Sequence, residues 1–275
     1  RDVAPSRGLG DVYKRQLTEA DAIVLRILKM PKEVVARIKG LKMIMRWGAG
    51  FDSVDIEEAG KHGIYVCNTP GANAYAVAEL TVALMLAVGR KLICHDRAIH
   101  QGEWSKNTFL NLTRTLNNKV VGIIGGGNIG RQVASRVQAF GSTVQYYDPF
   151  RLPEEMEEKL HMKYVGLEEL IRTSDVITLH VPLMDSTRHM IGEKEIEKMK
   201  DGAILINVAR GGLMDDEAVV NAVNSGKLSG AGIDCVEEEP AKPGSPILAN
   251  PNIIVTPHVG GGSADISDVM FPMIT

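Results

Sequence analysis

Three kinds of side chain that together suit acid–base chemistry on a carboxylic acid follow apolar runs in the second half of the chain. Arg210 follows one run, Asp234 and the acidic stretch 237–239 follow the next, and His258 follows a third. In an open parallel sheet such runs end at one rim, where ligands bind. Histidine exchanges protons near neutral pH, and arginine offers a charged fork to a carboxylate or carbonyl oxygen. The sequence order therefore predicts that an arginine, a carboxylate and a histidine converge.

A glycine motif earlier in the chain predicts a phosphate-binding loop. Gly125, Gly127 and Gly130 are spaced G-x-G-x-x-G, directly after the apolar run 120–124. These glycines suit a tight turn, close approach of a pyrophosphate, and close packing of the next helix on the strand. Asp148 ends the following strand, where it can accept hydrogen bonds from ribose hydroxyls and repel a 2′-phosphate. Asp148 therefore favours NAD over NADP. Glycine-rich turns also occur with no ligand, so the glycines alone would be a weaker indication.

The pattern of the second half of the chain is that of an α/β fold with a doubly wound parallel sheet, a Rossmann domain. Apolar strands alternate with amphipathic helices, which places helices on both faces of the sheet. A smaller α/β region with a βαβ pattern precedes this domain. The expected strands of the larger domain are 120–124, 143–147, 176–180, 203–207, 230–233 and 253–255.

Four segments are expected along the chain. Residues 1–16 lack a hydrophobic period and are interpreted as a non-native leader, with a genuine disordered leader as the alternative. Residues 17–73 are expected to form an incomplete substrate domain, and 74–262 an NAD-binding domain that begins with one long interdomain helix over 74–101. Residues 263–275 are interpreted as the start of a truncated return helix. The chain is thus expected to be a fragment truncated at both ends.

Composition narrows the classes of partner. The formal net charge is −3 and the sequence has no block rich in Lys and Arg, which argues against nucleic acid or an anionic membrane as a partner. The longest apolar run is too short to span a bilayer. The three cysteines show neither metal-ligand nor C-x-x-C spacing, which favours a reducing, cytoplasmic location.

These motifs, taken together, resemble those of the D-isomer-specific 2-hydroxyacid dehydrogenases, a family that includes phosphoglycerate, lactate, glycerate and formate dehydrogenases. The resemblance runs in family order from about residue 17 to the end of the chain. It rests on Arg46-x-Gly48-x-Gly50-x-Asp52, Asn68-Thr69-Pro70, Gly125-x-Gly127-x-x-Gly130, Asn207-x-Ala209-Arg210-Gly211, Asp234-x-x-x-x-Glu239-Pro240 and Pro257-His258-x-Gly260.

The resemblance implies a catalytic triad of Arg210, Glu239 and His258. His258 would exchange the hydroxyl proton as hydride passes between C2 of a small D-2-hydroxy acid and NAD. Glu239 would favour and orient the imidazolium, and Arg210 would hold the carboxylate and carbonyl oxygen. The backbone N–H groups of Ala49 and Gly50 would form a second carboxylate clamp. The smaller domain would be flavodoxin-like.

The resemblance also implies cofactor contacts and a homodimer to which the interdomain helix contributes. The small 2-hydroxy or 2-keto acid would be the other partner. The residues implied at the NAD site are Gly125, Gly127, Asn128, Ile129, Gly130, Asp148, Val181, Pro182, Val208, Ala209, Asp234, His258 and Gly260.

Other interpretations stay open from the sequence. The same fold also serves NAD(H)-sensing corepressor-like proteins that keep an Arg/Glu/His set, and an incomplete chain could lack function. His258 could be an ordinary loop histidine, and Arg210 could form a surface ion pair. Glu237 and Glu238 are interpreted as solvated loop residues, and His180 as a structural residue.

Overall fold

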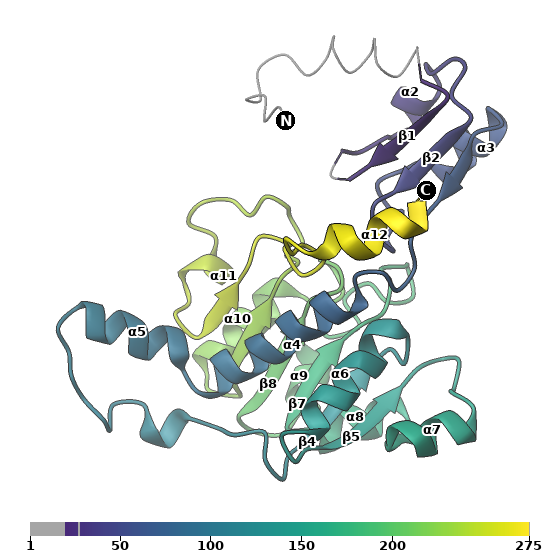
Figure 1. Ribbon diagram of the computed structural model, residues 1–275. Helices are drawn as coiled ribbons and strands as arrows, with labels where there is room; N and C mark the ends of the chain where they lie inside the picture. The colour runs from purple at the N-terminus through teal and green to yellow at the C-terminus, as the bar shows by residue number, and fades with distance from the viewer. Residues whose placement is uncertain (1–19, 27, 275) are drawn as a thin grey trace. The chain divides into compact units, whose positions relative to one another are not determined.

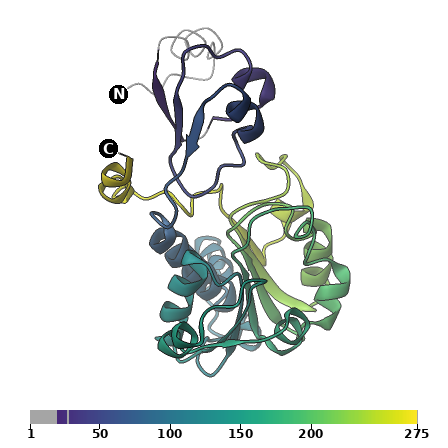
Figure 2. The same cartoon turned by 90° about the vertical axis from the view of Figure 1, so that its right-hand side faces the viewer.

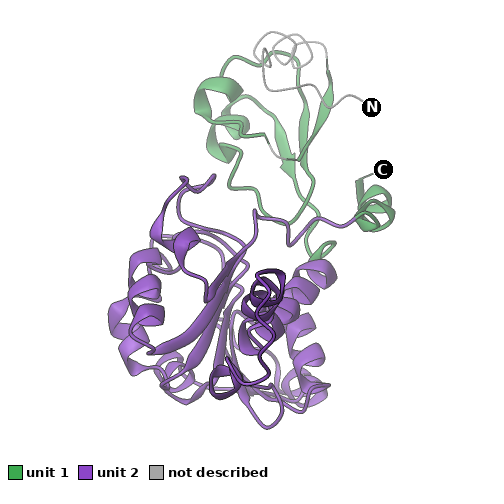
Figure 3. Ribbon diagram, turned by 90° about the vertical axis from the view of Figure 1, so that its left-hand side faces the viewer, with its two compact units in different colours: residues 1–73, 264–275 green, residues 74–263 purple. Residues whose placement is uncertain are grey.

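The protein consists of two compact units in the computed structural model, which describes residues 20–26 and 28–274 (Figures 1 and 3). Unit 1 comprises residues 1–73 and 264–275, and unit 2 comprises residues 74–263. The leader expected over 1–16 lies outside the described residues. No helix in the described ranges is long and apolar enough to cross a membrane.

Unit 1 is built on a parallel sheet with the strand order β1-β2-β3. Its core gathers apolar side chains from the sheet and two short helices, among them Ile44, Val35 and Ala59. Asp55 caps one of these helices, because its Oδ1 accepts a hydrogen bond from the N–H of Glu58 at 2.8 Å. The elements of unit 1 are β1 (Ala22–Leu25), α2 (Lys32–Val35), β2 (Met43–Arg46), α3 (Ile56–Lys61), β3 (Tyr65–Cys67) and α12 (Ile266–Ile274).

Unit 2 is a doubly wound α/β domain on a seven-stranded parallel sheet, ordered β10-β9-β8-β7-β4-β5-β6. The chain starts in the middle with β4, winds outward to β6, and returns through β7 to wind the other way, as in dinucleotide-binding folds. The strands are β4 (Val120–Ile124), β5 (Thr143–Tyr147), β6 (Met162–Tyr164), β7 (Val176–Leu179), β8 (Ala203–Asn207), β9 (Leu228–Ile233) and β10 (Ile253–Val255).

Apolar strand sequences bury both faces of this sheet. Val121 and Ile123 of β4 belong to the core beneath α4 and α6, whereas Ile124 belongs to the core beneath α8, α9 and α10. Successive side chains of a strand point to opposite faces, so a strand covered on both sides is apolar throughout. Helices therefore flank the sheet on either side (Figure 2). Those of unit 2 are α4 (Ala74–Gly89), α5 (Leu92–His100), η1 (Leu110–Leu112), α6 (Asn128–Gln138), α7 (Glu154–Leu160), α8 (Leu167–Thr173), α9 (Glu193–Lys198), α10 (Asp216–Asn224) and α11 (Pro246–Ala249).

The structure corrects two expectations about these elements. The six expected strands omitted β6, a three-residue edge strand whose Lys163 breaks the apolar pattern. The expected helix over 74–101 is two helices, because Lys91 between α4 and α5 has a left-handed backbone with φ of 52°. Its buried ammonium donates hydrogen bonds to the Ser229 carbonyl and, at 3.0 Å, to Asn252 Oδ1, which fixes the break.

A polar network centred on the buried Glu157 joins β5 to α7 in unit 2. Glu157 accepts hydrogen bonds from the Tyr146 hydroxyl at 2.6 Å and from Arg151 Nε and Nη2 at 2.9 Å each. The Arg151 guanidinium and then the Tyr146 hydroxyl lower the pKa of Glu157 to about 2. The ionised carboxylate is therefore the form that the folded protein stabilises.

This network predicts a loss of stability in acid. A folded-state pKa below the unfolded one gives stabilisation that is complete above the ordinary glutamate pKa and disappears as the pH falls toward about 2. We expect Glu157→Gln to lower the free energy of unfolding at pH 7 by about 1.5 to 3 kcal/mol, as for loss of a hydrogen bond to a charged group. Between pH 5 and pH 2 the variant should lose less stability than the native chain in urea titrations. Glu158→Gln, an exposed neighbour on α7, should behave like the native chain, and equal acid sensitivity in all three proteins would contradict this prediction.

Candidate active site

The glycine loop between β4 and α6 has the geometry of a phosphate cradle. Gly125 has φ of 108°, and a Cβ there would lie 2.4 Å from the His180 carbonyl oxygen. A Cβ on Gly130 would lie 2.1 Å from the Gly125 carbonyl oxygen, so only glycine lets α6 begin this close to the turn. Gly127, in contrast, has no atom within 4 Å of a Cβ position and is exposed. The open backbone at the N-terminus of α6 therefore fits a phosphate.

Asp148 is joined to the same loop. Its Oδ2 accepts a hydrogen bond from the Gly126 N–H at 2.8 Å, and its Oδ1 accepts one from the Phe150 N–H at 2.8 Å. The half-buried carboxylate thus lies beside the cradle at the end of β5. A ribose joined to a phosphate at Gly127 would meet this acid, so the residues present fit an adenine dinucleotide without a 2′-phosphate.

The loop that follows β8 holds Arg210 through a buried amide. Asn207 is fully buried; its Nδ2 donates to the Arg210 carbonyl at 2.9 Å, and its Oδ1 accepts from the Ala209 N–H at 3.1 Å. A Cβ on Gly211 would overlap the Val236 carbonyl oxygen at 1.9 Å, so this loop packs backbone to backbone against the segment after β9. These contacts fix where the Arg210 side chain leaves the sheet.

The loop that carries His258 is held by Asp234. The Asp234 side chain is 2% exposed and accepts hydrogen bonds from the Thr256 hydroxyl, from the Val259 N–H at 2.9 Å and from the Gly260 N–H at 2.7 Å. His258 donates its own N–H to the Asp234 carbonyl at 2.9 Å and has φ of 53°. Asp234 and Gly260 therefore shape this loop, and their predicted contact with NAD stays a prediction.

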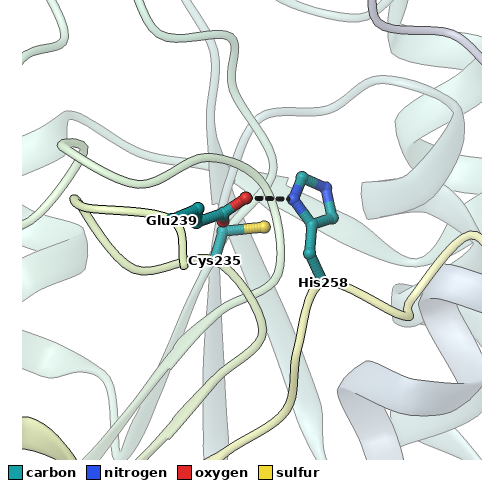
Figure 4. A group of neighbouring side chains, drawn as sticks. All are labelled: Cys235, Glu239 and His258. Atoms are coloured by element: carbon teal, nitrogen blue, oxygen red, sulfur yellow. Dashed lines mark hydrogen bonds and ion pairs between the residues drawn. The ribbon is translucent and has the colours of Figure 1, made fainter. Parts of the chain in front are cut away.

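His258 and Glu239 form the central pair of the site. His258 Nδ1 lies 2.9 Å from Glu239 Oε2, and the two side chains are 45% and 40% exposed (Figure 4). With Nδ1 engaged, proton exchange with a ligand is left to Nε2, to which no described residue is hydrogen bonded. The pair thus combines a fixed ring orientation with an accessible acid–base atom.

Two residues of the candidate site were not predicted to have a role there. Asn207 was part of a recognised motif, but its clamp on Arg210 depends on a turn that the spacing does not reveal. Cys235 is fully buried, and its Sγ lies with the Glu239 and His258 ligand atoms within 4.8 Å of one another. Burial, and then the neighbouring acidic charges of Asp234 and Glu239, raise the pKa of this thiol. Its position directly after Asp234 gave no signal in the sequence.

The other predicted NAD contacts lie at the carboxyl ends of neighbouring strands. Asn128 and Ile129 begin α6 after β4, Val181 and Pro182 follow β7, and Val208 and Ala209 follow β8. Since β4, β7 and β8 are adjacent and parallel, the structure brings these segments to one rim of unit 2.

The predicted carboxylate clamp lies in unit 1, in the loop after β2. The Ala49 carbonyl accepts a hydrogen bond from Asn68 Nδ2 at 2.7 Å, and the Gly50 carbonyl accepts one from Arg46 Nε at 3.0 Å. Thr69 Oγ1 accepts from the Gly48 N–H at 3.0 Å, so side chains fix this loop at three points. Its role toward a substrate stays a prediction.

Three polar residues at the rim of unit 2 have structural partners. Glu237 lies 3.0 Å from His189 Nε2, and Glu238 pairs with Lys242 at 2.8 Å. His180 Nε2 lies 3.0 Å from Thr178 Oγ1, and burial lowers the pKa of His180 to about 3, which keeps the ring neutral. Glu237 and Glu238, interpreted as solvated loop residues, thus have side-chain partners, and the interpretation of His180 as a structural residue stays a prediction.

Comparison with known proteins shows which family of proteins the chain is similar to. The family model for the NAD binding domain of D-isomer specific 2-hydroxyacid dehydrogenases matches residues 82–260. The chain is 40% identical over 277 residues to a glyoxylate reductase of Thermococcus litoralis, which covers 98% of this chain and 82% of that protein. It is 41% identical over 258 residues to a hydroxypyruvate reductase of Thermotoga maritima, and this match covers 93% of this chain and 82% of that protein.

A solved structure extends the likeness to the coordinates. The crystal structure of a D-lactate dehydrogenase from Aquifex aeolicus, complexed with NAD and lactic acid, is similar with a TM-score of 0.84 and 32% identity. The match covers 95% of this chain and 82% of that one. The fold described above is thus that of a structure which binds NAD.

The glycine loop yields a prediction that separates binding from folding. Gly127→Ala places a methyl group in open space, so it should leave thermal stability unchanged and weaken NADH binding roughly tenfold, about 1.4 kcal/mol. Gly130→Ala instead overlaps the Gly125 carbonyl and should cost about 1 to 3 kcal/mol of stability. Thermal melts and NADH fluorescence titrations of both variants measure this. An unchanged NADH affinity in Gly127→Ala would refute the phosphate cradle.

Proposed function

Because the chain belongs to the D-isomer specific 2-hydroxyacid dehydrogenase family, we propose that Arg210, Glu239 and His258 are its catalytic residues. The chain is an NAD-dependent oxidoreductase that interconverts a small D-2-hydroxy acid and its 2-keto acid. The single observation that carries the assignment of residues is the bond of 2.9 Å between His258 Nδ1 and Glu239 Oε2 at the rim that also bears Arg210.

His258 is proposed as the acid–base residue. When bound, NAD supplies the hydride acceptor and NADH the donor. In the oxidation, His258 Nε2 takes the proton of the substrate hydroxyl; in the reduction, it returns a proton to the carbonyl oxygen. Glu239 stabilises the imidazolium through Nδ1 and holds the plane of the ring. The ring therefore needs no reorientation between the two directions.

Arg210 is proposed to bind the substrate's oxygens. Its guanidinium is always charged and planar, so it can hold the carboxylate and polarise the carbonyl. The buried Asn207 keeps the loop that carries it fixed, which makes Asn207 a positioning residue. The N–H groups of Ala49 and Gly50 are proposed as the second carboxylate contact, which makes unit 1 the substrate domain and unit 2 the NAD-binding domain.

The cofactor site is proposed at the glycine loop with Asp148. The open position at Gly127 supports contact with the pyrophosphate, and the acid beside it supports contact with the ribose hydroxyls. Asn128, Ile129, Val181, Pro182, Val208 and Ala209 are proposed to line the rest of the cofactor site, with Asp234, His258 and Gly260 at the nicotinamide end. The rim position of these residues supports the assignment.

We propose glyoxylate and hydroxypyruvate as the first substrates to test, because reductases of these acids are among the similar proteins. The NAD(H)-sensing alternative gains no support from these relatives, whose names are those of enzymes. A cytoplasmic location is proposed from the three cysteines, which are all unpaired.

The test follows NADH oxidation with glyoxylate, hydroxypyruvate, pyruvate, phenylpyruvate and phosphohydroxypyruvate, with NADPH in parallel. We expect turnover with NADH, and a fall of about 10²- to 10⁴-fold in kcat in His258→Ala, as for loss of a general acid–base group. His189→Ala is the matched control, because His189 also contacts a glutamate, at 3.0 Å, but lies outside the motif. Full activity in His258→Ala would overturn the assignment, and NADH binding without turnover would favour the sensing function.

A homodimer is proposed through the segment that follows α4. Helix α5 has no buried residue although it carries large apolar side chains: Leu92, Ile93 and Ile99 are 52%, 44% and 45% exposed. In the segment that follows α5, Trp104 and Leu110 are 81% and 60% exposed. An apolar surface of this kind indicates a site of protein association, and a second copy of the chain is the partner that the family resemblance implies.

Sedimentation equilibrium tests this state. We expect about twice the chain mass of 29.9 kDa for the native protein and monomer for Ile93→Glu/Ile99→Glu, since two charges in an apolar interface lack partners. Lys106→Glu, which changes an exposed charge in the segment after α5, should leave the dimer intact. A native chain that sediments at 29.9 kDa would refute the proposal.

A further inference from the structure

Cys235 gives the catalytic pair a third ligand that acid–base chemistry does not use. The Sγ atom, a Glu239 carboxylate oxygen and a His258 ring nitrogen lie within 4.8 Å of one another. In Figure 4 the Sγ atom points to the side on which the carboxylate and the imidazole meet. Thiolate, imidazole and carboxylate are together a typical donor set for zinc and for the softer cadmium ion. No other group of this kind occurs among the described residues.

We propose that Cys235, Glu239 and His258 form an inhibitory binding site for a thiophilic divalent cation, Zn²⁺ or Cd²⁺. The inhibitory part of this inference rests on the proposed role of His258, whereas the binding part does not. A water molecule would complete the tetrahedral coordination.

The geometry needs only small movements to accept the ion. Ligand atoms around a tetrahedral zinc lie about 3.3 to 3.7 Å apart, which follows from bond lengths of about 2.0 to 2.3 Å. The Nδ1 to Oε2 distance of 2.9 Å would open slightly, and the longer separations, up to 4.8 Å, would close. Glu239 and His258 are 40% and 45% exposed, so both can rotate and both are accessible to an ion from solvent.

Charge at the site also suits a cation. The carboxylates of Asp234 and Glu239 act on Cys235 with negative charge, and the guanidinium of Arg210 opposes them. Binding forms bonds from the cation to Sγ, to Nδ1 and to a Glu239 oxygen. The thiol proton leaves to solvent, and the neutral ring exchanges its Nδ1 proton, through solvent, for one on Nε2. The thiolate and the Glu239 carboxylate then balance the two positive charges of the ion.

Coordination at Nδ1 removes the acid–base function of His258. The ring keeps its remaining proton on Nε2 and has no lone pair left to accept another. It also no longer exchanges its Nδ1 proton with Glu239. Both directions of the reaction should therefore stop, although the glycine loop keeps its open position at Gly127.

The experiment titrates the protein with CdCl₂ and ZnCl₂ in chelator-free buffer. The first readout is the ultraviolet charge-transfer band of a cadmium–thiolate bond, which needs no activity. The second is the rate of NADH-dependent reduction of the best keto acid. The test variant is Cys235→Ala, and Cys235→Ser replaces it if Cys235→Ala folds poorly. The matched control is Cys67→Ala/Cys94→Ala, which removes the two partly exposed thiols and leaves Cys235.

We expect the native chain and the control to show one cadmium–thiolate band per chain and to lose activity with the same midpoint. Cys235→Ala should lack the band and shift the midpoint at least tenfold upward, since even an outer partner of a metal ligand is worth about 10- to 100-fold in affinity. Absence of the band in the native chain, or an unchanged band or midpoint in Cys235→Ala, would overturn the proposal. A band with no measurable turnover of any keto acid would uphold the metal site and count against the proposed function.

Discussion

The candidate site depends above all on the buried carboxylate of Asp234. It accepts hydrogen bonds from the Thr256 hydroxyl and from the N–H groups of Val259 and Gly260, which join the end of β9 to the loop after β10. Those donors hold His258 in a left-handed backbone conformation that a side chain other than glycine rarely adopts. Loss of the carboxylate would leave buried N–H groups without partners and free the loop. The position of the histidine is therefore set by an acid that takes no part in the proposed chemistry.

The same solution recurs on the neighbouring strand. Asn207 ends β8, and its side-chain amide fixes the loop that carries Arg210. Asp234 follows β9, and its carboxylate fixes the loop that carries His258. Both side chains are buried at the carboxyl end of adjacent parallel strands, where the sheet runs out of backbone partners. Each of the two proposed catalytic side chains, Arg210 and His258, thus lies on a loop that is tied to a buried anchor. This arrangement suits a site in which positions must be held to a fraction of an ångström.

Much of this framework was predictable from the sequence, because strands buried on both faces are apolar throughout. The runs at β4, β5 and β8 coincide with the strands observed. The edge strand β6 was missed, since edge strands need not be apolar and Lys163 interrupts the pattern. The break at Lys91 was missed because it depends on partners at Ser229 and Asn252, far away in the chain. Local periodicity carries no record of such contacts.

The sequence displays the predicted site residues, but it does not display the contacts that hold them in place. Arg210, Glu239 and His258 belong to motifs that the sequence displays, and the structure brings the last two into contact. The clamps of Asn207 and Asp234 depend on turn geometry, and the approach of Cys235 depends on how the chain folds back after β9. No spacing rule encodes these, because a side chain's partners in a turn are chosen by backbone dihedrals.

The exposure of the central pair bears on how it works. Opposite charges about 4 Å apart attract by about 1 kcal/mol in water and about 4 kcal/mol at the effective dielectric of a protein surface. With side chains 40% and 45% exposed, Glu239 and His258 lie toward the weaker limit, and the pair chiefly fixes the ring. Bound cofactor and substrate would exclude water and strengthen the attraction. With the roles proposed for them, the contact between Glu239 and His258 should therefore be strongest when the reactants are present, which is when the proton is transferred.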